Sequence, residues 1–321
     1  MYNPRVTIHS ISALADRLRA NIQTVIVGKN DVIDLALVAL LCEGHALFED
    51  VPGIGKTTLA KAIARSLNCV FKRIQFTPDL LPSDVTGISF FNQRQQEFEF
   101  RPGPIFSNVL LADEINRATP RTQSALLEAM QERQVTVDGQ TMPLSRPFLV
   151  LATQNPIELE GTFPLPEAQV DRFLIRISMG YPTVEEEHQI LARFERSDPL
   201  DKLSSVADIA ELTGLQAVTR TVRVERSVAD YLVTICRSTR NAQGAQLGVS
   251  PRGTMALYRA AQAYAAIHGR DYVLPDDVKV LASPVLSHRI VLDGQSRLRG
   301  RKAEDILRDV VERTPVPVDR I

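Results

Sequence analysis

The chain has 321 residues, which is long enough for two domains with buried cores. Hydrophobic residues make up 44% of it and charged residues 23%, as in an ordinary water-soluble globular protein. Its 37 basic and 38 acidic residues give a formal net charge of −1. This balance excludes a whole-chain electrostatic attraction to nucleic acid or to anionic membranes, and leaves only local patches open.

The cysteines, the N-terminus and the apolar runs predict a cytoplasmic protein, and the histidines argue against a zinc site. The three cysteines are an odd number without C-x-x-C spacing, so we expect reduced thiols and no disulfide framework. The five histidines form no cluster with zinc-ligand spacing. We expect no signal peptide, because "MYNPRVTIHS" has neither a charged leader nor an apolar core behind it. We also expect no membrane span, because the longest apolar run, Leu35 to Cys42, is far below the roughly 20 residues that a spanning helix needs.

Short apolar runs alternate with helical patterns in the first half of the chain, which is typical of a parallel α/β sheet. The first run, residues 45–49, leads directly into a glycine loop and then a helix, in which Leu59, Ile63 and Leu67 lie on one face. We expect further strands at residues 70–76, 108–113, 148–153 and 172–178. The runs that end at residues 113 and 153 are almost entirely apolar, as expected for central strands covered on both faces.

Two segments interrupt this alternation and predict inserted hairpins. Residues 88–106 alternate apolar and polar residues on both sides of a polar centre, with the hairpin itself expected near 88–101. Residues 134–141 carry Asp138-Gly139 between alternating residues, which is the strongest short-range hairpin signal. Neither signal carries a function by itself.

From Pro182 onward the pattern is helical. Val224, Val228, Tyr231 or Leu232, and Ile235 have helical spacing, and residues 274–278 open a further helix. A long helix is expected over residues 250–269, with the N-cap, first-turn proline and C-cap glycine at Ser250, Pro251 and Gly269. We therefore expect an α/β domain over residues 1–181, followed by a smaller helical domain over 182–321.

The glycine loop nearly matches the phosphate-binding template G-x-x-x-x-G-K-[ST], but Asp50 occupies the first glycine position. Gly53 and Gly55 supply the free backbone conformations that let successive N–H groups face an anion. Lys56 adds a charge for the β- and γ-phosphates, and the Thr57 hydroxyl can ligate Mg²⁺. An acidic side chain at position 50 would repel phosphate if it pointed inward.

A second pattern, "VLLADEINRA", completes a hydrolytic site. Asp113 and Glu114 stand at the carboxyl end of an apolar strand, where α/β sheets place their ligands. Asp113 can hold Mg²⁺, and Glu114 can orient and deprotonate an attacking water. Two such motifs in the correct order seldom coincide by chance.

Three longer segments make the chain resemble the MoxR family of AAA+ ATPases over almost its whole length. They are "EDVPGIGKT", "DEINRATPRTQSALLEAMQERQVTVDG" and "ATQNPIELEGTFPLPEAQVDRF". The first template position in this family is often not glycine, so the resemblance implies that the nucleotide site is retained. It also implies a five-stranded parallel sheet between helices, followed by an all-α lid.

The resemblance implies roles for residues outside the two motifs. Asn155 is similar to the sensor-one residue, which contacts the γ-phosphate or the attacking water. Arg172 resembles the arginine finger that enters a neighbouring subunit, with Arg117 and Arg121 as rivals for that role. Arg252, in "SPRG", resembles sensor two, a lid arginine that touches phosphate within its own subunit. The implied nucleotide contacts are Val27 and Gly28 at the adenine, and Asp50, Val51, Pro52, Gly53, Ile54, Gly55, Lys56, Thr57 and Thr58 in the loop.

What the resemblance implies about function is Mg²⁺-dependent ATP hydrolysis in a ring, expected to be a hexamer. The ring would act on a protein client in complex maturation or metal-cofactor insertion, with a partner that carries a von Willebrand factor A domain. The hairpins would line the pore or contact partners, and two arginines offset by two glutamates in the first argue against nucleic acid. The alternatives are a magnesium-chelatase-like motor subunit, a nucleic-acid-dependent motor, and a scaffold that binds nucleotide without hydrolysis, which the presence of Glu114 disfavours.

Overall fold

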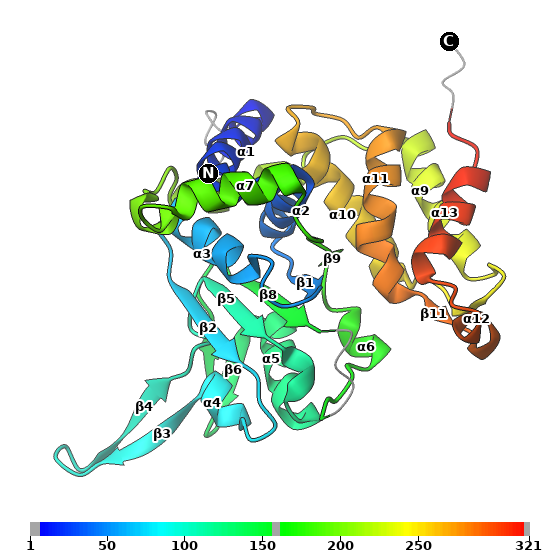
Figure 1. Cartoon of the computed structure of the whole chain (residues 1–321). Helices are drawn as coiled ribbons and strands as arrows, with labels where there is room; N and C mark the ends of the chain where they lie inside the picture. The colour runs from blue at the N-terminus through cyan, green and yellow to red at the C-terminus, as the bar shows by residue number, and fades with distance from the viewer. Residues whose placement is uncertain (1–6, 156–160, 318–321) are drawn as a thin grey trace.

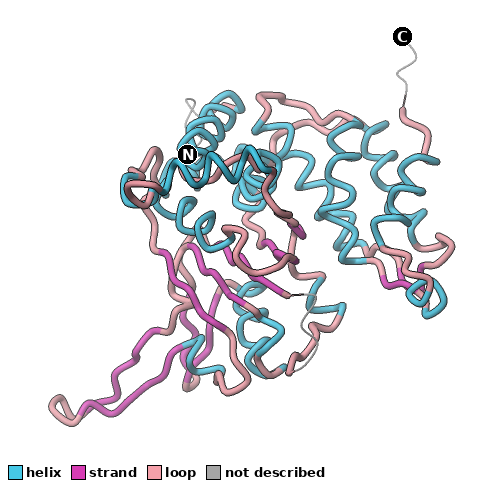
Figure 2. The backbone as a smooth tube through the Cα atoms, in the orientation of Figure 1, coloured by secondary structure: helices cyan, strands magenta, loops and turns pink. Residues whose placement is uncertain are grey.

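A sheet-centred region and a helical region make up the molecule in this computed structural model, which describes residues 7–155 and 161–317 (Figure 1). The sheet has five parallel strands: β1 (Ala46–Glu49), β2 (Phe71–Gln75), β5 (Val109–Asp113), β8 (Leu149–Gln154) and β9 (Ile175–Ile177). Their order is β2-β5-β8-β1-β9. Figure 2 shows the strands in magenta and the helices in cyan, with the helical region beside the sheet. The five strands and their parallel pairing were predicted. Strand β8 lies between the strand that carries the glycine loop and the strand that carries the acidic pair.

Alternating side chains on the central strands supply two separate hydrophobic cores. Phe48, Leu111 and Leu151 face helices α1 (Ile8–Gln23), α2 (Asn30–Leu41) and α3 (Lys56–Ser66). Leu110 and Val150 face the opposite side, with α4 (Pro82–Thr86) and α5 (Pro120–Glu132). Because both faces are covered, these strands read as continuous apolar runs in the sequence.

Both predicted hairpins are present. Strands β3 (Gly87–Asn92) and β4 (Glu97–Pro102) form the first, which projects away from the body of the molecule (Figure 1). Strands β6 (Gln134–Val137) and β7 (Gln140–Pro143) form the second. Its turn residues Asp138 and Gly139 have φ values of 50° and 76°, the two positive angles that a tight I′ turn requires.

The second half of the chain is mainly helical, as predicted. Its helices are α6 (Glu167–Val170), α7 (Val184–Phe194), α8 (Ile209–Thr219), α9 (Arg226–Thr239), α10 (Pro251–Ile267), α11 (Pro275–Leu286), α12 (Gly294–Leu298) and α13 (Ala303–Arg313). Ser250 caps α10 by accepting a hydrogen bond from the Gly253 N–H, and Pro251 is its first residue. The helix ends at Ile267 and His268 is its C-cap, so the predicted C-cap residue Gly269 comes one residue later, with a φ of 74°. No helix among the described residues is long and apolar enough to cross a membrane.

Two details of this half were not predicted. Val224 lies two residues before the start of α9, so the helical spacing expected from residue 224 begins too early. Two very short strands, β10 (Ala245–Leu247) and β11 (Val291–Leu292), pair antiparallel among the helices. Strands of two and three residues are too short to show a recognisable alternation.

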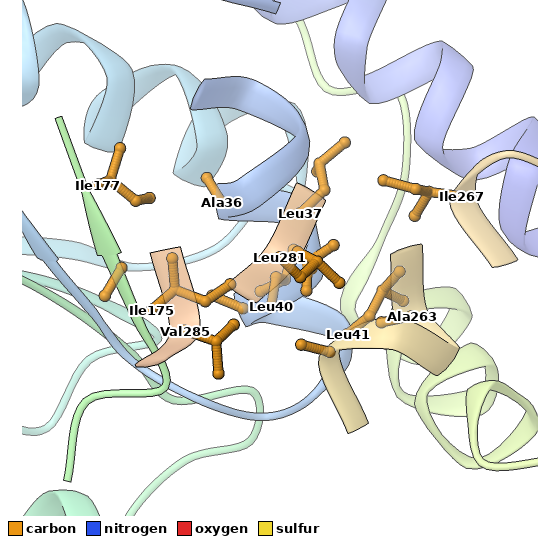
Figure 3. Close-up of a cluster of buried hydrophobic side chains, with 14 of the residues drawn as sticks. Ala36, Leu37, Leu40, Leu41, Ile175, Ile177, Ala263, Ile267, Leu281 and Val285 are labelled. Atoms are coloured by element: carbon orange, nitrogen blue, oxygen red, sulfur yellow. The ribbon is translucent and has the colours of Figure 1, made fainter. Parts of the chain in front are cut away.

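Helix α2 joins the helical region to the sheet. Leu37, Leu40 and Leu41 of α2 lie among side chains of β9, α10 and α11 (Figure 3). The helical region therefore packs against the edge of the sheet formed by β9. The expected domain boundary at residues 181/182 stays a prediction.

Candidate nucleotide-binding and hydrolysis site

One cavity of about 360 Å³ lies at the carboxyl ends of the central strands. Both sequence motifs and the residue after β8 line it, as expected for parallel strands whose ends meet at one edge of a sheet. The lining residues are Asp50, Pro52, Gly53, Gly55, Lys56, Thr57, Thr58, Arg73, Gln75, Asp113, Glu114, Thr153 and Asn155. The structure thus brings together the predicted phosphate loop, the acidic pair and the sensor-one residue.

The glycine loop has the geometry of an anion cradle. Gly53 and Gly55 have φ values of 86° and 96°, which other residues adopt only with strain. Gly55 is the N-cap of α3, so the loop ends on a helix N-terminus. The Lys56 ammonium donates to the carbonyls of Asp50, at 2.9 Å, and Val51, at 3.2 Å. Burial lowers the pKa of Lys56, and nearby carboxylates, Asp50 first among them, oppose that shift.

The Asp50 carboxylate bonds to the segment after β9, which answers the concern about phosphate repulsion. It accepts hydrogen bonds from the Ser178 hydroxyl at 3.0 Å, from the Met179 N–H, and from the Gly180 N–H at 3.4 Å. These three donors offset its negative charge. A glycine at position 50 would leave them without this acceptor.

The acidic pair is fixed by a threonine on the neighbouring strand. The Thr153 hydroxyl donates to Asp113 Oδ1 at 2.6 Å and accepts from the Glu114 N–H at 2.8 Å. Glu114 has a φ of 55°, a left-handed conformation that is uncommon for a residue other than glycine. Backbone conformations of this kind often occur at functional sites, where the surrounding structure holds them in place.

Two residues of β2 contact the acidic pair and were missed by the sequence analysis. Arg73 Nη2 donates to Asp113 Oδ2 at 2.7 Å, and Gln75 Nε2 donates to Glu114 Oε2 at 2.7 Å. Gln75 is the register partner of Asp113, so its place at the strand end predicts this contact once the strand order is known. Arg117 Nε lies 3.0 Å from Glu114 Oε2, so this rival for the finger is paired within its own chain.

The donor set fits a magnesium nucleotide. The Thr57 hydroxyl and the Asp113 carboxylate line the same cavity as the loop and are hard oxygen ligands. Mg²⁺ is usually held by one or two such protein ligands, with substrate phosphates and water completing its shell.

A second, mainly apolar cavity of about 370 Å³ adjoins the first and shares Pro52, Gly53, Gly55 and Thr58 with it. Val27 lines it and Gly28 does not, while their contact with adenine stays a prediction. The sequence analysis did not name its other lining residues, which lie beside Val27, in the segment after β9 and in α7: Val25, Ile26, Lys29, Met179, Tyr181, Pro182, Glu187, Ile190 and Phe194. A flat apolar base fits such a cavity.

Comparison with known proteins supports this assignment. Residues 45–175 match the family described as "ATPase family associated with various cellular activities (AAA)", and residues 237–310 match "AAA lid domain". The chaperone MoxR1 of Mycobacterium tuberculosis is 41% identical over 94% of this chain and 82% of its own length. The chain belongs to the MoxR family of AAA+ ATPases.

Two further relatives of this MoxR-family chain cover nearly all of it. The uncharacterized protein YeaC of Bacillus subtilis is 54% identical over 94% of both chains. The crystal structure of a candidate ATPase from Cytophaga hutchinsonii superposes with a TM-score of 0.90 at 37% identity, covering 97% of this chain and 98% of the other. The fold predicted from the sequence is therefore confirmed, whereas the roles of individual residues stay predictions.

In this MoxR-family chain, the arginines expected as finger and sensor two, Arg172 and Arg252, lie outside the phosphate cavity. Arg172 and Arg252 line a separate cavity of about 320 Å³, which shares no lining residue with the phosphate cavity. Arg252 Nη1 is 3.9 Å from Asp171 Oδ2. Arg133, Arg259 and Arg289 line this cavity as well, so its lining holds five arginines and two carboxylates, Glu43 and Asp171.

Arg252 does not line the phosphate cavity of its own chain, where the sensor-two role was expected to place it, and that role stays a prediction. Arg252 stands at the start of α10, and α10 packs against α2 and α11 beside the β9 edge of the sheet (Figure 3). The helix therefore directs its N-terminus toward Asp171 rather than toward the glycine loop. Arg121, the other rival for the finger, is exposed at the start of α5.

Proposed function

We propose that this protein hydrolyses ATP with Mg²⁺ at sites that two copies of the chain complete together, within a ring that we expect to be a hexamer. The observation that carries the proposal is the separation of the two cavities. Lys56, Asp113 and Glu114 meet in one, whereas Arg172 and Arg252 share another. Arg172 and Arg252 of one copy lie away from the phosphate cavity of that copy, but they can reach the phosphates bound by a neighbouring copy.

The proposal gives roles to the glycine loop and to five side chains of the phosphate cavity. The loop N–H groups and Lys56 bind the β- and γ-phosphates. Thr57 and Asp113 hold Mg²⁺, which neutralises charge on the phosphate oxygens. Glu114 takes the proton of the attacking water, and Asn155 orients that water or the γ-phosphate. The adjoining apolar cavity takes the adenine base.

Arginines from the neighbouring copy would stabilise the charge that develops in the transition state. Such an arginine increases the rate of phosphoryl transfer by about 10³–10⁵. Within the described residues, the Arg172 guanidinium has no hydrogen-bond or ion-pair partner, so it is available to a neighbour. We assign Arg172 the finger role and Arg252 a second contact with the same phosphates.

The work that hydrolysis drives would be remodelling of a protein client. The projecting hairpin exposes Phe91 and Phe98, at 47% and 76%, and their rings pack edge to face 5.4 Å apart. Exposed aromatic side chains are a common feature of protein-binding surfaces. We propose a chaperone role in complex maturation or metal-cofactor insertion, with a partner carrying a von Willebrand factor A domain. A cytoplasmic location fits the supply of ATP and the free thiols Cys42, Cys69 and Cys236.

The test is the ATPase rate per subunit measured against protein concentration, together with Arg172→Ala and Arg252→Ala. We expect the rate to rise with concentration, and each variant to lose about 10³-fold in kcat while ADP binding is retained. A rate that is independent of concentration and indifferent to both variants would refute the shared site. Stimulation by DNA, but not by unfolded protein, would instead indicate a nucleic-acid motor.

A further inference from the structure

Arg289 is a buried arginine that forms hydrogen bonds with the residues on both sides of Arg172. It ends the short helix η3 (Ser287–Arg289), and its side chain is 3% exposed. Its Nε donates to Asp171 Oδ1 at 2.7 Å, and its Nη2 donates to the Phe173 carbonyl at 2.7 Å. A buried guanidinium is tolerated only when its donors are paired, and these two bonds fall on either side of residue 172.

The same arginine also packs against the turn that carries Arg252. A Cβ atom added to Gly253 would lie 2.6 Å from Val249 Cγ1 and 2.7 Å from Arg289 Cδ, closer than real Cβ atoms approach other atoms in proteins. The glycine of the "SPRG" segment therefore makes room for the side chains of both Val249 and Arg289. Asp171 completes the connection, because its Oδ1 accepts from Arg289 while its Oδ2 lies 3.9 Å from Arg252 Nη1.

The elements that carry these residues form one packed unit. Helix α11, which precedes Arg289, places Leu281 and Val285 among Ile175 of β9 and Leu40 of α2 (Figure 3). The helical region is thus fixed to the β9 edge of its own sheet, next to Arg172, by apolar packing as well as by Arg289. Lid and finger would move together rather than close independently over the nucleotide of the same chain.

We propose that Arg289 is a positioning residue that holds Arg172 and Arg252 as one two-arginine unit for delivery to a neighbouring copy. The inference rests on the proposed shared site and deepens it. Arg289 touches no substrate, and it acts through the backbone on both sides of Arg172 and through the space beside Gly253. Misplacement of a catalytic group by about 1 Å can cost 10²-fold in rate, so loosening this grip should lower kcat without altering nucleotide binding.

The decisive comparison is Arg289→Lys against the matched control Arg270→Lys. Arg270 also makes an ion pair, partly buried, by bonding both oxygens of Asp277 at 2.6 Å, but that pair has no bond to residues 171–174. Lysine keeps the charge and loses the fork that reaches two acceptors at once. Both variants should lose stability, but only Arg289→Lys should lower kcat, by about tenfold or more, with the Kd of ADP changed less than about twofold.

Hydrogen exchange supplies a readout that does not depend on activity. Amides of residues 171–174 should exchange faster in Arg289→Lys and remain protected in Arg270→Lys. If Arg289→Lys fails to fold, Gly253→Ala crowds Arg289 Cδ as well as Val249 Cγ1 while keeping the charge of Arg289, and it should reproduce both effects. Unchanged kcat and unchanged exchange in either folded Arg289→Lys or Gly253→Ala would overturn the inference.

Parallel variants separate this inference from the shared-site proposal. If Arg172→Ala and Arg252→Ala lose activity but Arg289→Lys does not, the shared site stands and only the positioning role fails. If Arg172→Ala and Arg252→Ala both keep full activity, the shared site itself fails, and the role of Arg289 fails with it.

Discussion

Restoring the template glycine at position 50 should weaken nucleotide binding rather than improve it. A purely template-based argument expects Asp50→Gly to remove a charge that repels phosphate. In the structure, this carboxylate instead accepts hydrogen bonds from Ser178, Met179 and Gly180. Met179 and Tyr181, in and beside that segment, line the apolar cavity that we propose for adenine, so Asp50 connects the glycine loop to the wall of that cavity.

The size of the effect follows from the bonds lost. Two backbone donors lose a charged acceptor, at about 1 kcal/mol each in this partly exposed position. Glycine adds about 0.5–1 kcal/mol through the entropy of the unfolded chain. The expected loss of stability is therefore about 2–3 kcal/mol. If about 1.4 kcal/mol of this loss reduces the free energy of ATP binding, the Kd of ATP rises tenfold. Repulsion of phosphate by Asp50 is smaller, because three donors offset the charge and water screens it.

The assay is calorimetric titration of Asp50→Gly, Asp50→Asn and Ser178→Ala with ADP and with a slowly hydrolysed ATP analogue. Asparagine keeps the size and one acceptor oxygen but loses the charge, so its affinity should lie between those of the parent and the glycine variant. Ser178→Ala removes a single bond of an exposed hydroxyl and should have little effect. If Asp50→Gly and Asp50→Asn both bind nucleotide more tightly than the parent, repulsion dominates and the reasoning is wrong.

Two further predictions concern polar groups next to the sheet. Gln75→Leu should raise the basal turnover severalfold, because Glu114 loses a donor that holds one of its oxygens at 2.7 Å, and lower turnover would mean that Gln75 orients the base. Burial lowers the pKa of His45 to about 4, from an ordinary value of 6.5. As the pH falls, the unfolded chain therefore takes up a proton on His45 before the folded chain does. The free energy of unfolding falls by about 3 kcal/mol between about pH 6.5 and pH 4, and about 2 kcal/mol of this is lost by pH 5. Denaturant midpoints at pH 7 and pH 5 should show a shallower dependence in His45→Asn, whereas an equal slope would contradict this.

Much of the phosphate site could be predicted from the sequence, because local pattern determines it. A glycine loop between a strand and a helix can face only one edge of a parallel sheet, and an acidic pair that ends a buried strand lies at that same edge. Gly53, Lys56, Asp113 and Glu114 were therefore placed together correctly. Asn155 joined them because it follows β8, the strand between β1 and β5.

The rest of the site depends on contacts that local pattern does not contain. Gln75 becomes relevant only when β2 pairs with β5, and the order of strands is set by long-range packing. Met179 and Tyr181 join Val27 across about half of the chain. The position of Arg252 is decided by how α10 and α11 pack on the β9 edge, which its "SPRG" segment does not encode. Helix capping at Ser250, by contrast, was predicted, because it involves neighbours three residues apart.

Mixing two inactive variants tests most directly whether two copies of the chain share each site. Glu114→Gln lacks the base but keeps both arginines, and Arg252→Ala keeps the base but lacks one arginine. If the site is shared, mixed assemblies contain interfaces with an intact Glu114 on one copy and an intact Arg252 on the next, and ATPase activity should reappear well above the sum of the two variants. If the mixture stays as inactive as its components while it assembles normally, Arg252 acts within its own chain and the shared site is contradicted.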